Sequence, residues 1–344
     1  MPNAKRIFLI GNFKDESPQS VRIERRRWVK GLIRLGHDVQ RFSYRNIMQQ
    51  ASLIKNKRFA QQFAKKRTDK ILIKQVKSYH PDIVFVLNMK YLDENTVLAM
   101  RGASPQATFV GRDNDAFPEK NAARLAISKK MDIVVATNGG KWLSAYKEAG
   151  VPVCAFIPNP CDPDIQRPYE VDEKWKSDIV FTGKAENKGA DCDISRYELL
   201  QKLSKKPHVK LYGCFGNPKT DGIETFYAIS GAKIALSINR VNRIRLYHSD
   251  RLVNCIACGT FTLAKRVPDS DLLFKDGVHL RYFDTVEEFF DLANWYLRND
   301  EEREKIAKAG MKIAHTEFNC LKMAQYVLDL IEKGHYDAPW AKIL

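Results

Sequence analysis

Residues 107–137, ATFVGRDNDAFPEKNAARLAISKKMDIVVAT, contain the pattern that decides the fold. Two short apolar runs, ATFVG (107–111) and DIVVAT (132–137), enclose a more polar, helical stretch. Runs as apolar as these are typical of strands buried on both faces, which occur in parallel sheets covered by helices on both sides. A strand, a helix and a second strand in this order predict a βαβ unit.

The same alternation continues over the rest of the chain. In the first half, strands are predicted at residues 5–11, 37–42, 82–87, 107–111, 132–137 and 153–156. In the second half, they are predicted at residues 178–183, 209–213, 233–238, 260–264 and 279–283. The fold class is therefore α/β, with two Rossmann-like doubly wound domains. A helical tail is predicted over about the last sixty residues.

A proline-rich segment separates the two patterns. Four prolines, at positions 158, 160, 163 and 168, interrupt the periodicity. We therefore predict an N-terminal domain over residues 1–157, a linker over 158–177 and a C-terminal domain over 178–344 that includes the terminal helices. Two such domains are expected to face a cleft at the carboxyl ends of their strands, where doubly wound folds bind ligands.

The composition is that of a soluble globular protein, with 344 residues of which 44% are hydrophobic and 28% charged. Seven cysteines with one close pair exclude a disulfide scaffold and fit reduced thiols. That pair, Cys255 and Cys258, is expected to pack in the core. No apolar run reaches the length of a secretion signal or a membrane span. We expect cytoplasmic localisation, with peripheral contact at the inner face of the membrane as an option.

Positive charge is concentrated near the N-terminus. The chain carries a net charge of +16, and the segment from Arg22 to Lys77 holds 17 basic and 3 acidic residues, a net of +14 that leaves +2 for the remainder. Much of it lies on a long helical region predicted from about Met48 to Ser78. Such a concentration favours a partner with negative charge, such as nucleic acid, an anionic membrane or an anionic polymer.

A phosphate-binding helix is predicted at residues 249–258, SDRLVNCIAC. No GxGxxG follows the first strand, and no P-loop motif occurs in the chain. Ser249 is a suitable N-cap residue, and a helix N-terminus attracts anions through its backbone N–H groups. Basic residues in the loop just before it would add donors to a diphosphate. They are Arg240, Arg243, Arg245 and His248.

Two polar turns follow predicted strands. In GKAENKG (183–189), Lys184 and Lys188 are within reach of a phosphate. Asp113 and Asp115 follow the strand 107–111, where one carboxylate could serve as general base on the hydroxyl of an acceptor. The D-x-D pattern also marks metal-dependent sugar transferases of another fold. Because two further matches occur in this chain, we predict no metal site.

Four stretches appear in a familiar order: LGHDV (35–39), IPNPCDPDI (157–165), SDRLVNCIACGT (249–260) and EEREKIAKAGMKIAHTEF (301–318). This ordered set resembles the GT-B glycosyltransferases, and in particular their CgeB-like and GT4-like branch. The resemblance implies that the second domain holds most of a nucleotide-sugar donor, with no cofactor beyond this co-substrate and with the nucleotide base left open.

The resemblance also assigns residues by position. Ser249 and Arg251 would face the donor diphosphate. The turn with Gly183, Lys184 and Lys188 would contact its phosphates, and Asp113 would lie on the side of the sugar acceptor. The chain departs from the family at two positions. Asn254 stands where the family has the glutamate that binds the donor ribose, and Leu246 where the GT4-like pattern has its earlier glutamate.

Three functions remain open at this point. The leading hypothesis is a metal-independent glycosyltransferase that moves a sugar from a nucleotide-diphosphate sugar to a hydroxyl of an anionic acceptor, such as a cell-envelope glycan or glycolipid. Its basic N-terminal helices would bind the acceptor or an anionic membrane. The second is a phage-type transferase that modifies a DNA base. The third is a non-catalytic nucleotide- or glycan-binding protein with the same fold.

Overall fold

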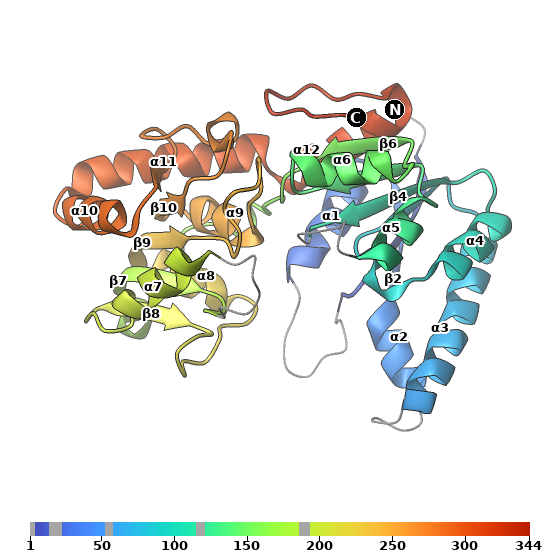
Figure 1. The fold of residues 1–344 in the computed structure, drawn as a ribbon, viewed down its shortest axis with the longest axis horizontal. Helices are drawn as coiled ribbons and strands as arrows, with labels where there is room; N and C mark the ends of the chain where they lie inside the picture. Colours follow the sequence, from blue (N-terminus) through green and yellow to red (C-terminus); the bar gives the residue numbers. More distant parts are fainter. Residues whose placement is uncertain (1–3, 14–22, 52–57, 115–120, 186–192) are drawn as a thin grey trace. The chain divides into compact units, whose positions relative to one another are not determined.

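The computed structural model describes residues 4–13, 23–51, 58–114, 121–185 and 193–344 (Figure 1). The chain divides into two compact units. Unit 1 contains residues 1–157 and 323–344, and unit 2 contains residues 158–322. Among the helices in the described ranges, none is long and apolar enough to cross a membrane.

Unit 1 is built on a six-stranded parallel sheet with the strand order β2-β1-β3-β4-β5-β6. Its strands are short and, apart from the edge strand β2, largely buried, as expected for a sheet covered on both faces. They are β1 (Arg6–Gly11), β2 (Asp38–Ser43), β3 (Ile83–Val86), β4 (Thr108–Asp113), β5 (Ile133–Ala136) and β6 (Val153–Phe156).

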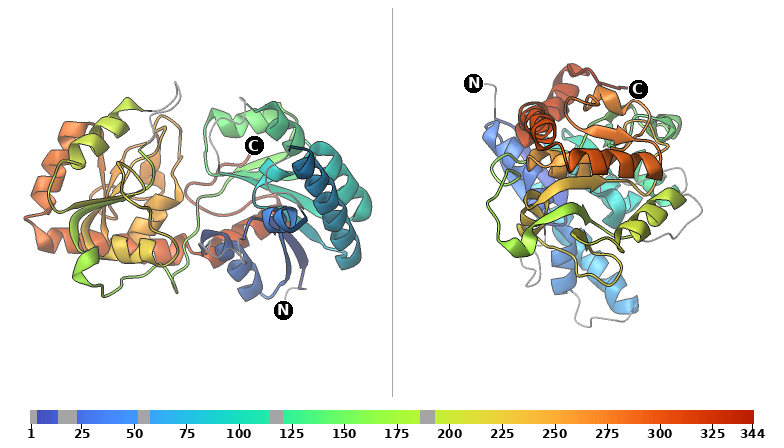
Figure 2. Two further views of the ribbon diagram at one scale, coloured as in Figure 1. Left: turned by 90° about the horizontal axis from the view of Figure 1, so that it is seen from below. Right: turned by 90° about the vertical axis from the view of Figure 1, so that its left-hand side faces the viewer.

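The helices of unit 1 lie on both faces of this sheet (Figures 1 and 2). The basic region predicted to be helical from about Met48 to Ser78 is helical where the structure describes it, in the end of α2 and in α3, and residues 52–57 lie outside the described ranges. The helices are α1 (Ile23–Arg34), α2 (Tyr44–Ala51), α3 (Arg58–Tyr79), η1 (Met89–Tyr91), α4 (Glu94–Ala103), α5 (Ala122–Ser128), α6 (Lys141–Glu148) and most of α12 (Cys320–Lys333).

Unit 2 repeats the arrangement with five parallel strands in the order β11-β10-β9-β7-β8. Its strands are β7 (Ser177–Thr182), β8 (Val209–Tyr212), β9 (Ala232–Ser237), β10 (Phe261–Lys265) and β11 (Arg281–Phe283). Its helices are η3 (Glu173–Trp175), α7 (Ile194–Leu203), α8 (Glu224–Ser230), α9 (Asp250–Ala257), η4 (Ser270–Leu272), α10 (Val286–Tyr296) and α11 (Asp300–Glu317).

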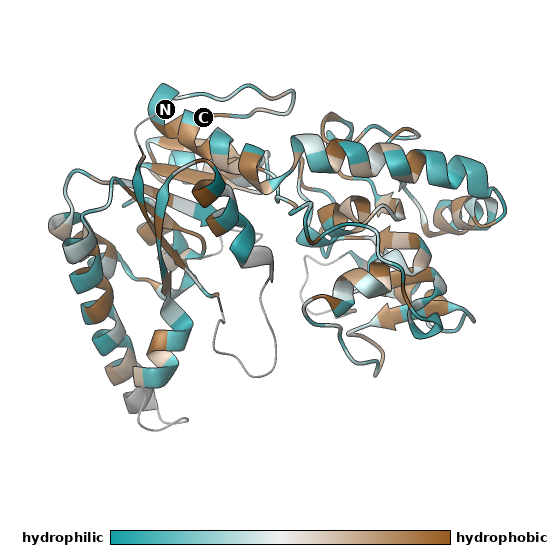
Figure 3. Cartoon of the chain, turned by 180° about the vertical axis from the view of Figure 1, so that it is seen from behind, coloured by the Kyte–Doolittle hydropathy of each residue, from teal (hydrophilic) through white to brown (hydrophobic). Residues whose placement is uncertain are grey.

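The predicted fold class is confirmed: both sheets are parallel, helices alternate with strands, and the chain ends in helices. Figure 3 shows the hydrophobic colour concentrated on the central strands and the hydrophilic colour on the outer faces of the helices. Cys255 and Cys258 are both buried, as expected for core residues.

In each sheet the second strand of the unit lies on one side of the first and the third strand on the other. The order therefore reverses between β1 and β3, and between β7 and β9. Ligands of doubly wound folds bind at such reversal points.

The end of the chain packs differently from the prediction, which placed residues 178–344 in one domain. Residues 323–344 belong to unit 1. The backbone N–H of Leu344 donates to the carbonyl of Cys154 at 2.8 Å, and the N–H of Phe156 donates to the carbonyl of Lys342 at 2.9 Å. Trp340 packs edge-on against Phe156 with ring centroids 5.6 Å apart. Because β6 is an edge strand, its unpaired backbone groups are satisfied by this returning segment.

Candidate active site

Arg251 lies at the reversal point of the second sheet. It belongs to the first turn of α9, and its side chain reaches the carboxyl ends of both strands that flank this point. Its Nε donates a hydrogen bond to the carbonyl of Thr182 at 2.6 Å, and its Nη1 donates one to the carbonyl of Ile238 at 3.0 Å. The guanidinium also stacks over the ring of Phe181, 4.5 Å from its centroid. Burial lowers the pKa of Arg251, but an arginine stays charged at neutral pH.

Gly183 and Arg251 are fitted to each other. Gly183 directly follows β7 and has a φ of +145°, a backbone conformation that residues with a side chain rarely adopt. A Cβ atom at this position would lie 2.5 Å from Nη2 of Arg251. The backbone N–H of Gly183 donates to the carbonyl of Tyr212 at 2.8 Å, which fixes the end of β7 to β8. The glycine therefore leaves the space that the guanidinium fills.

The loop between β9 and α9 is held by buried asparagines that the sequence analysis did not single out. The side-chain oxygen of Asn239 accepts from the N–H of Ser249 at 3.1 Å. The side-chain oxygen of Asn242 accepts from the N–H of Asn239 at 3.0 Å, and its Nδ2 donates to Asp193 at 2.6 Å. Two asparagines directly after a buried strand were the available signal, because buried polar groups need partners.

Ser249 begins α9, as predicted, but it acts through its backbone. Its φ and ψ of −80° and 164° are those of an N-cap residue, yet its side chain makes no capping hydrogen bond. The Ser249 hydroxyl instead lies 3.5 Å from Nη1 of Arg251. The backbone N–H groups of the first turn are thus not capped by this side chain, and together with the guanidinium they can donate to an anion, although the same turn carries the carboxylate of Asp250.

His248 is not the cationic contact that was expected. Its side chain is buried, and its Nδ1 lies 3.2 Å from the carbonyl of Leu246. The backbone carbonyl of His248 accepts a hydrogen bond from Nδ2 of Asn159 at 3.0 Å. Burial lowers the pKa of His248 to about 4. The imidazole is therefore neutral at pH 7 and contributes no positive charge to the site.

The remaining basic candidates lie at the surface. Arg245 forms an ion pair with Asp269, and Arg243 is exposed. The side chain of Lys184 is exposed, while its backbone carbonyl accepts a hydrogen bond from the buried Arg196. Lys188 lies outside the described residues. These positions remain predictions as phosphate contacts.

Asn254 is part of a buried amide pair. It lies on α9 with its side-chain oxygen accepting from Nε2 of Gln166 at 2.6 Å. Gln166 is fully buried, and its own oxygen accepts from the N–H of Asp162 at 2.7 Å. Asn254 therefore joins the 158–177 segment to α9, and its contact with a ribose remains a prediction.

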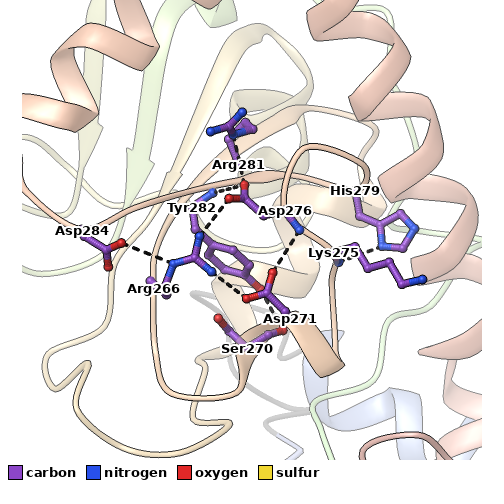
Figure 4. A network of polar contacts seen from close by, with 9 residues as sticks. All are labelled: Arg266, Ser270, Asp271, Lys275, Asp276, His279, Arg281, Tyr282 and Asp284. Carbon is purple, nitrogen blue, oxygen red and sulfur yellow. Dashed lines mark hydrogen bonds and ion pairs between the residues drawn. The ribbon is translucent and has the colours of Figure 1, made fainter.

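A charged network stabilises the segment after β10 (Figure 4). Arg266 contacts Asp271 at 2.6 Å, Asp276 at 2.8 Å and Asp284 at 3.4 Å, and it stacks over Tyr282. The same segment contains Asp269, the partner of Arg245, and Pro268, whose carbonyl accepts from the N–H of Leu246 at 2.9 Å. The network therefore supports the loop that leads into α9.

Asp113 ends β4 in unit 1 and is buried. Its Oδ2 accepts a short hydrogen bond from the hydroxyl of Tyr146 and lies 3.2 Å from Nη1 of Arg124. Burial, and then the charge of Asp113, raise the pKa of Tyr146 far above its usual value, so the phenol stays protonated. The carboxylate is thus already paired, which favours an orienting role over that of a free base. Asp115 lies outside the described residues.

Comparison with solved structures identifies the fold. HepE from Anabaena, in complex with UDP and glucose, is 11% identical, with a TM-score of 0.61 over 95% of this chain and 99% of HepE. Sucrose-phosphate synthase from Thermosynechococcus elongatus is 12% identical, with a TM-score of 0.63 over 96% of this chain and 98% of that one. A putative UDP-N-acetylglucosamine 2-epimerase from Listeria monocytogenes is 12% identical, with a TM-score of 0.54 over 96% of both chains. The fold is that of the GT-B glycosyltransferases.

A family model narrows the class of activity. Residues 196–329 match the family described as glycosyl transferase-like. The matched range contains α9 and the network around Arg266. No curated protein sequence matches the chain. Together, the fold and this match support a GT-B glycosyltransferase and sugar transfer.

Proposed function

We propose that the protein transfers a sugar from a nucleotide-diphosphate sugar to a hydroxyl of an anionic acceptor, such as a glycan or glycolipid of the cell envelope. The observation that carries this proposal is the position of Arg251, which joins the ends of β7 and β9 at the reversal point of the second sheet. The solved structure of HepE, described in complexes with UDP and with UDP-glucose, makes a uridine nucleotide the first donor to test.

The proposed mechanism stabilises the leaving group. As the bond between the sugar and the diphosphate breaks, negative charge develops on the diphosphate oxygens. The guanidinium of Arg251 and the backbone N–H groups of the first turn of α9 are held in place before the reaction, so they stabilise that charge without reorganising. Helix and arginine supply this stabilisation from the protein itself, so metal independence is part of the proposal. The CgeB-like or GT4-like branch also remains a proposal.

The acceptor side is assigned to unit 1. In this proposal Asp113 orients the acceptor, because its carboxylate is buried and paired with Tyr146 and Arg124, and the proton of the acceptor hydroxyl passes to an oxygen of the departing diphosphate. An ionised carboxylate retains further lone pairs, so it can also accept a hydrogen bond from a sugar hydroxyl.

A basic stripe on α3 supports an acceptor at an anionic membrane. Its five cations are exposed, and in the described part of the chain none of them makes a side-chain hydrogen bond or an ion pair; they are Lys66, Arg67, Lys70, Lys74 and Lys77. The one acidic residue of the helix, Asp69, is paired with Lys65 at 2.7 Å. Phe63, at the start of the stripe, is 58% exposed. Unpaired cations beside an exposed aromatic ring fit the interface of an anionic bilayer.

DNA is the alternative partner for this stripe, since the phosphates of DNA and of anionic lipids attract the same cations. The exposed phenylalanine favours the bilayer. A third option, binding of a nucleotide or glycan without catalysis, uses the same donor contacts and differs only in the absence of turnover.

Thermal unfolding with nucleotide diphosphates tests the donor site. UDP, GDP, dTDP, ADP and their sugars are compared, with CMP-sugars as an outgroup. A ligand at a hundredfold excess over its Kd stabilises the folded state by about 2.7 kcal/mol, so one nucleotide family is expected to raise the melting temperature clearly. Product formation from that donor then separates transfer from binding alone.

Gly183→Ala is the variant that tests the role of Arg251 in this binding, because the added methyl group displaces the Arg251 guanidinium. It should abolish the nucleotide-dependent shift. Gly334→Ala provides the control: its φ is +75° and nothing lies within 4 Å of the added Cβ, so it introduces backbone strain alone. A chain that responds to no nucleotide at millimolar concentration would refute the donor site.

A further inference from the structure

A cavity of about 250 Å³ opens in unit 1 at the carboxyl ends of β3 and β4. Its walls come from the segment after β3, from the end of β4 and from α5. The residues that decide its chemistry are Asn88, Lys90, Arg112, Asp113, Asn121 and Arg124.

The charge of this cavity is positive. Two cations, those of Lys90 and Arg124, line it beside a single carboxylate, that of Asp113, and Arg112 is a further lining residue. Asp113 is itself paired with Arg124 at 3.2 Å, and Arg112 lies 5.4 Å from the centroid of the Trp28 ring. Since the Arg112 guanidinium lies over Trp28, the charges of Lys90, Arg124 and Asp113 give the lining a net charge of +1, which favours an anionic ligand over a neutral one.

Two asparagines add donors to this lining. The side-chain oxygen of Asn88 accepts from the N–H of Lys90 at 3.0 Å, and that of Asn121 accepts from the N–H of Arg124 at 3.0 Å. Both oxygens are used in capping, so the NH₂ group of each amide is what remains for a ligand. Guanidinium, ammonium and amide donors together suit a ligand group that only accepts hydrogen bonds, namely a carboxylate or a phosphate.

The cavity also has an apolar side. Met89, Leu92 and Ile127 are buried and line it together with the polar groups. A pyranose ring has an apolar face of C–H groups that can pack against such side chains. The volume lies below the roughly 300–1,000 Å³ of sites for drug-sized ligands, so it fits one ring with its charged substituent.

We propose that this cavity binds an anionic pyranose, a sugar ring carrying a carboxylate or a phosphate. Arg124 contacts the charged group, and Asp113 is a positioning residue that holds the Arg124 guanidinium. The inference rests on the proposed function, in which this ring is part of the sugar acceptor, and it adds the chemical class of that ring.

The test is binding by isothermal titration calorimetry, with the full chain and without donor. Four probes are compared: glucuronate, glucose 6-phosphate, glucose and inorganic phosphate. We expect one or both anionic sugars to bind at least tenfold more tightly than glucose and than phosphate alone. The stronger of the two identifies the charged group as carboxylate or phosphate.

Variants tie that binding to the cavity. Arg124→Gln and Lys90→Gln should each weaken that binding at least fivefold. If loss of the Arg124–Asp113 pair unfolds the protein, Lys90→Gln still tests the inference, because Lys90 is exposed. Lys129→Gln, an exposed cation that does not line the cavity, should leave binding unchanged.

The outcomes separate this inference from the proposed function. Equal binding of charged and neutral sugars, equal binding of phosphate alone, or unchanged binding in both variants would overturn the inference. If a nucleotide diphosphate binds while none of the four probes does, the inference fails and the donor site stands. If no nucleotide binds either, the proposed function fails as well.

Discussion

His248 and Arg251 lie three positions apart, yet at neutral pH Arg251 is charged and His248 is neutral. Arg251 keeps its charge because the pKa of a guanidinium lies so far above neutral that burial does not remove the proton. His248 is buried with its Nδ1 directed at one carbonyl, and burial lowers its pKa to about 4 from an ordinary value of 6.5. As a result, only one of these two basic residues can stabilise a phosphate at neutral pH.

This difference predicts a loss of stability in acid. In the unfolded chain His248 binds a proton below pH 6.5, whereas in the folded chain it stays neutral down to about pH 4. The free energy of unfolding therefore falls as the pH drops from 6.5 to 4 and does not change above pH 6.5. Between pH 7 and pH 4.5 the loss amounts to roughly 2–3 kcal/mol. In urea unfolding, the free energy of unfolding of His248→Gln should drop between about pH 7 and about pH 4.5 by that amount less than the wild-type value does.

The exposed His335 supplies the comparison. His335→Gln should follow the wild-type pH dependence. An equal acid loss in His248→Gln and wild type would show that His248 is not the residue responsible.

At the scale of a helix, α3 and α11 both carry several lysines but arrange them differently. On α11, Lys305 pairs with Glu302 at 3.3 Å and Lys308 with Glu304 at 3.7 Å. On α3, the cations of the basic stripe make no ion pair in the described structure. Intrahelical pairs neutralise the field of α11, whereas the field of α3 remains available to a partner.

Vesicle binding tests the basic stripe. The triple variant Lys66→Gln, Lys70→Gln and Lys74→Gln should bind vesicles of phosphatidylcholine with phosphatidylglycerol roughly a hundredfold more weakly, since each lysine near an anionic surface contributes about 1 kcal/mol. Neutral vesicles should bind neither protein. The charge-matched control on α11, Lys305→Gln with Lys308→Gln and Lys312→Gln, should behave as the wild type.

A different result would change the partner. If the wild type ignores anionic vesicles but binds duplex DNA with steep salt dependence, and the α3 variant loses that binding, DNA replaces the membrane as the anionic surface.

For the whole molecule, the C-terminal segment stabilises the unit that contains the N-terminus. Trp340 is 4% exposed and packs on Phe156, whereas Trp295 in α10 is 47% exposed. Trp340→Ala should therefore cost unit 1 about 3–5 kcal/mol, and Trp295→Ala should cost little. Hydrogen–deuterium exchange checks this: protection should fall in β6 and persist in β10. Equal loss in both strands would contradict the division into units.

The sequence predicted the strands well because each is a short apolar run bounded by polar or turn residues, a local signal. It also placed Arg251 at the start of the right helix. It did not show that Asn254 pairs with Gln166, or that Leu344 returns to Cys154, because those contacts join residues far apart in the chain. The protonation state of His248 depends on burial, which local periodicity does not specify.

The return of residues 323–344 to unit 1 has a consequence for synthesis. Protein domains usually fold in order as the nascent chain leaves the ribosome, the N-terminal one first. Here the segment that covers β6 is translated after all of unit 2. Unit 2 can therefore complete its fold while unit 1 still exposes Phe156 and an open sheet edge. During that interval the part of the chain that was made first presents an uncovered strand edge, a kind of surface that promotes aggregation.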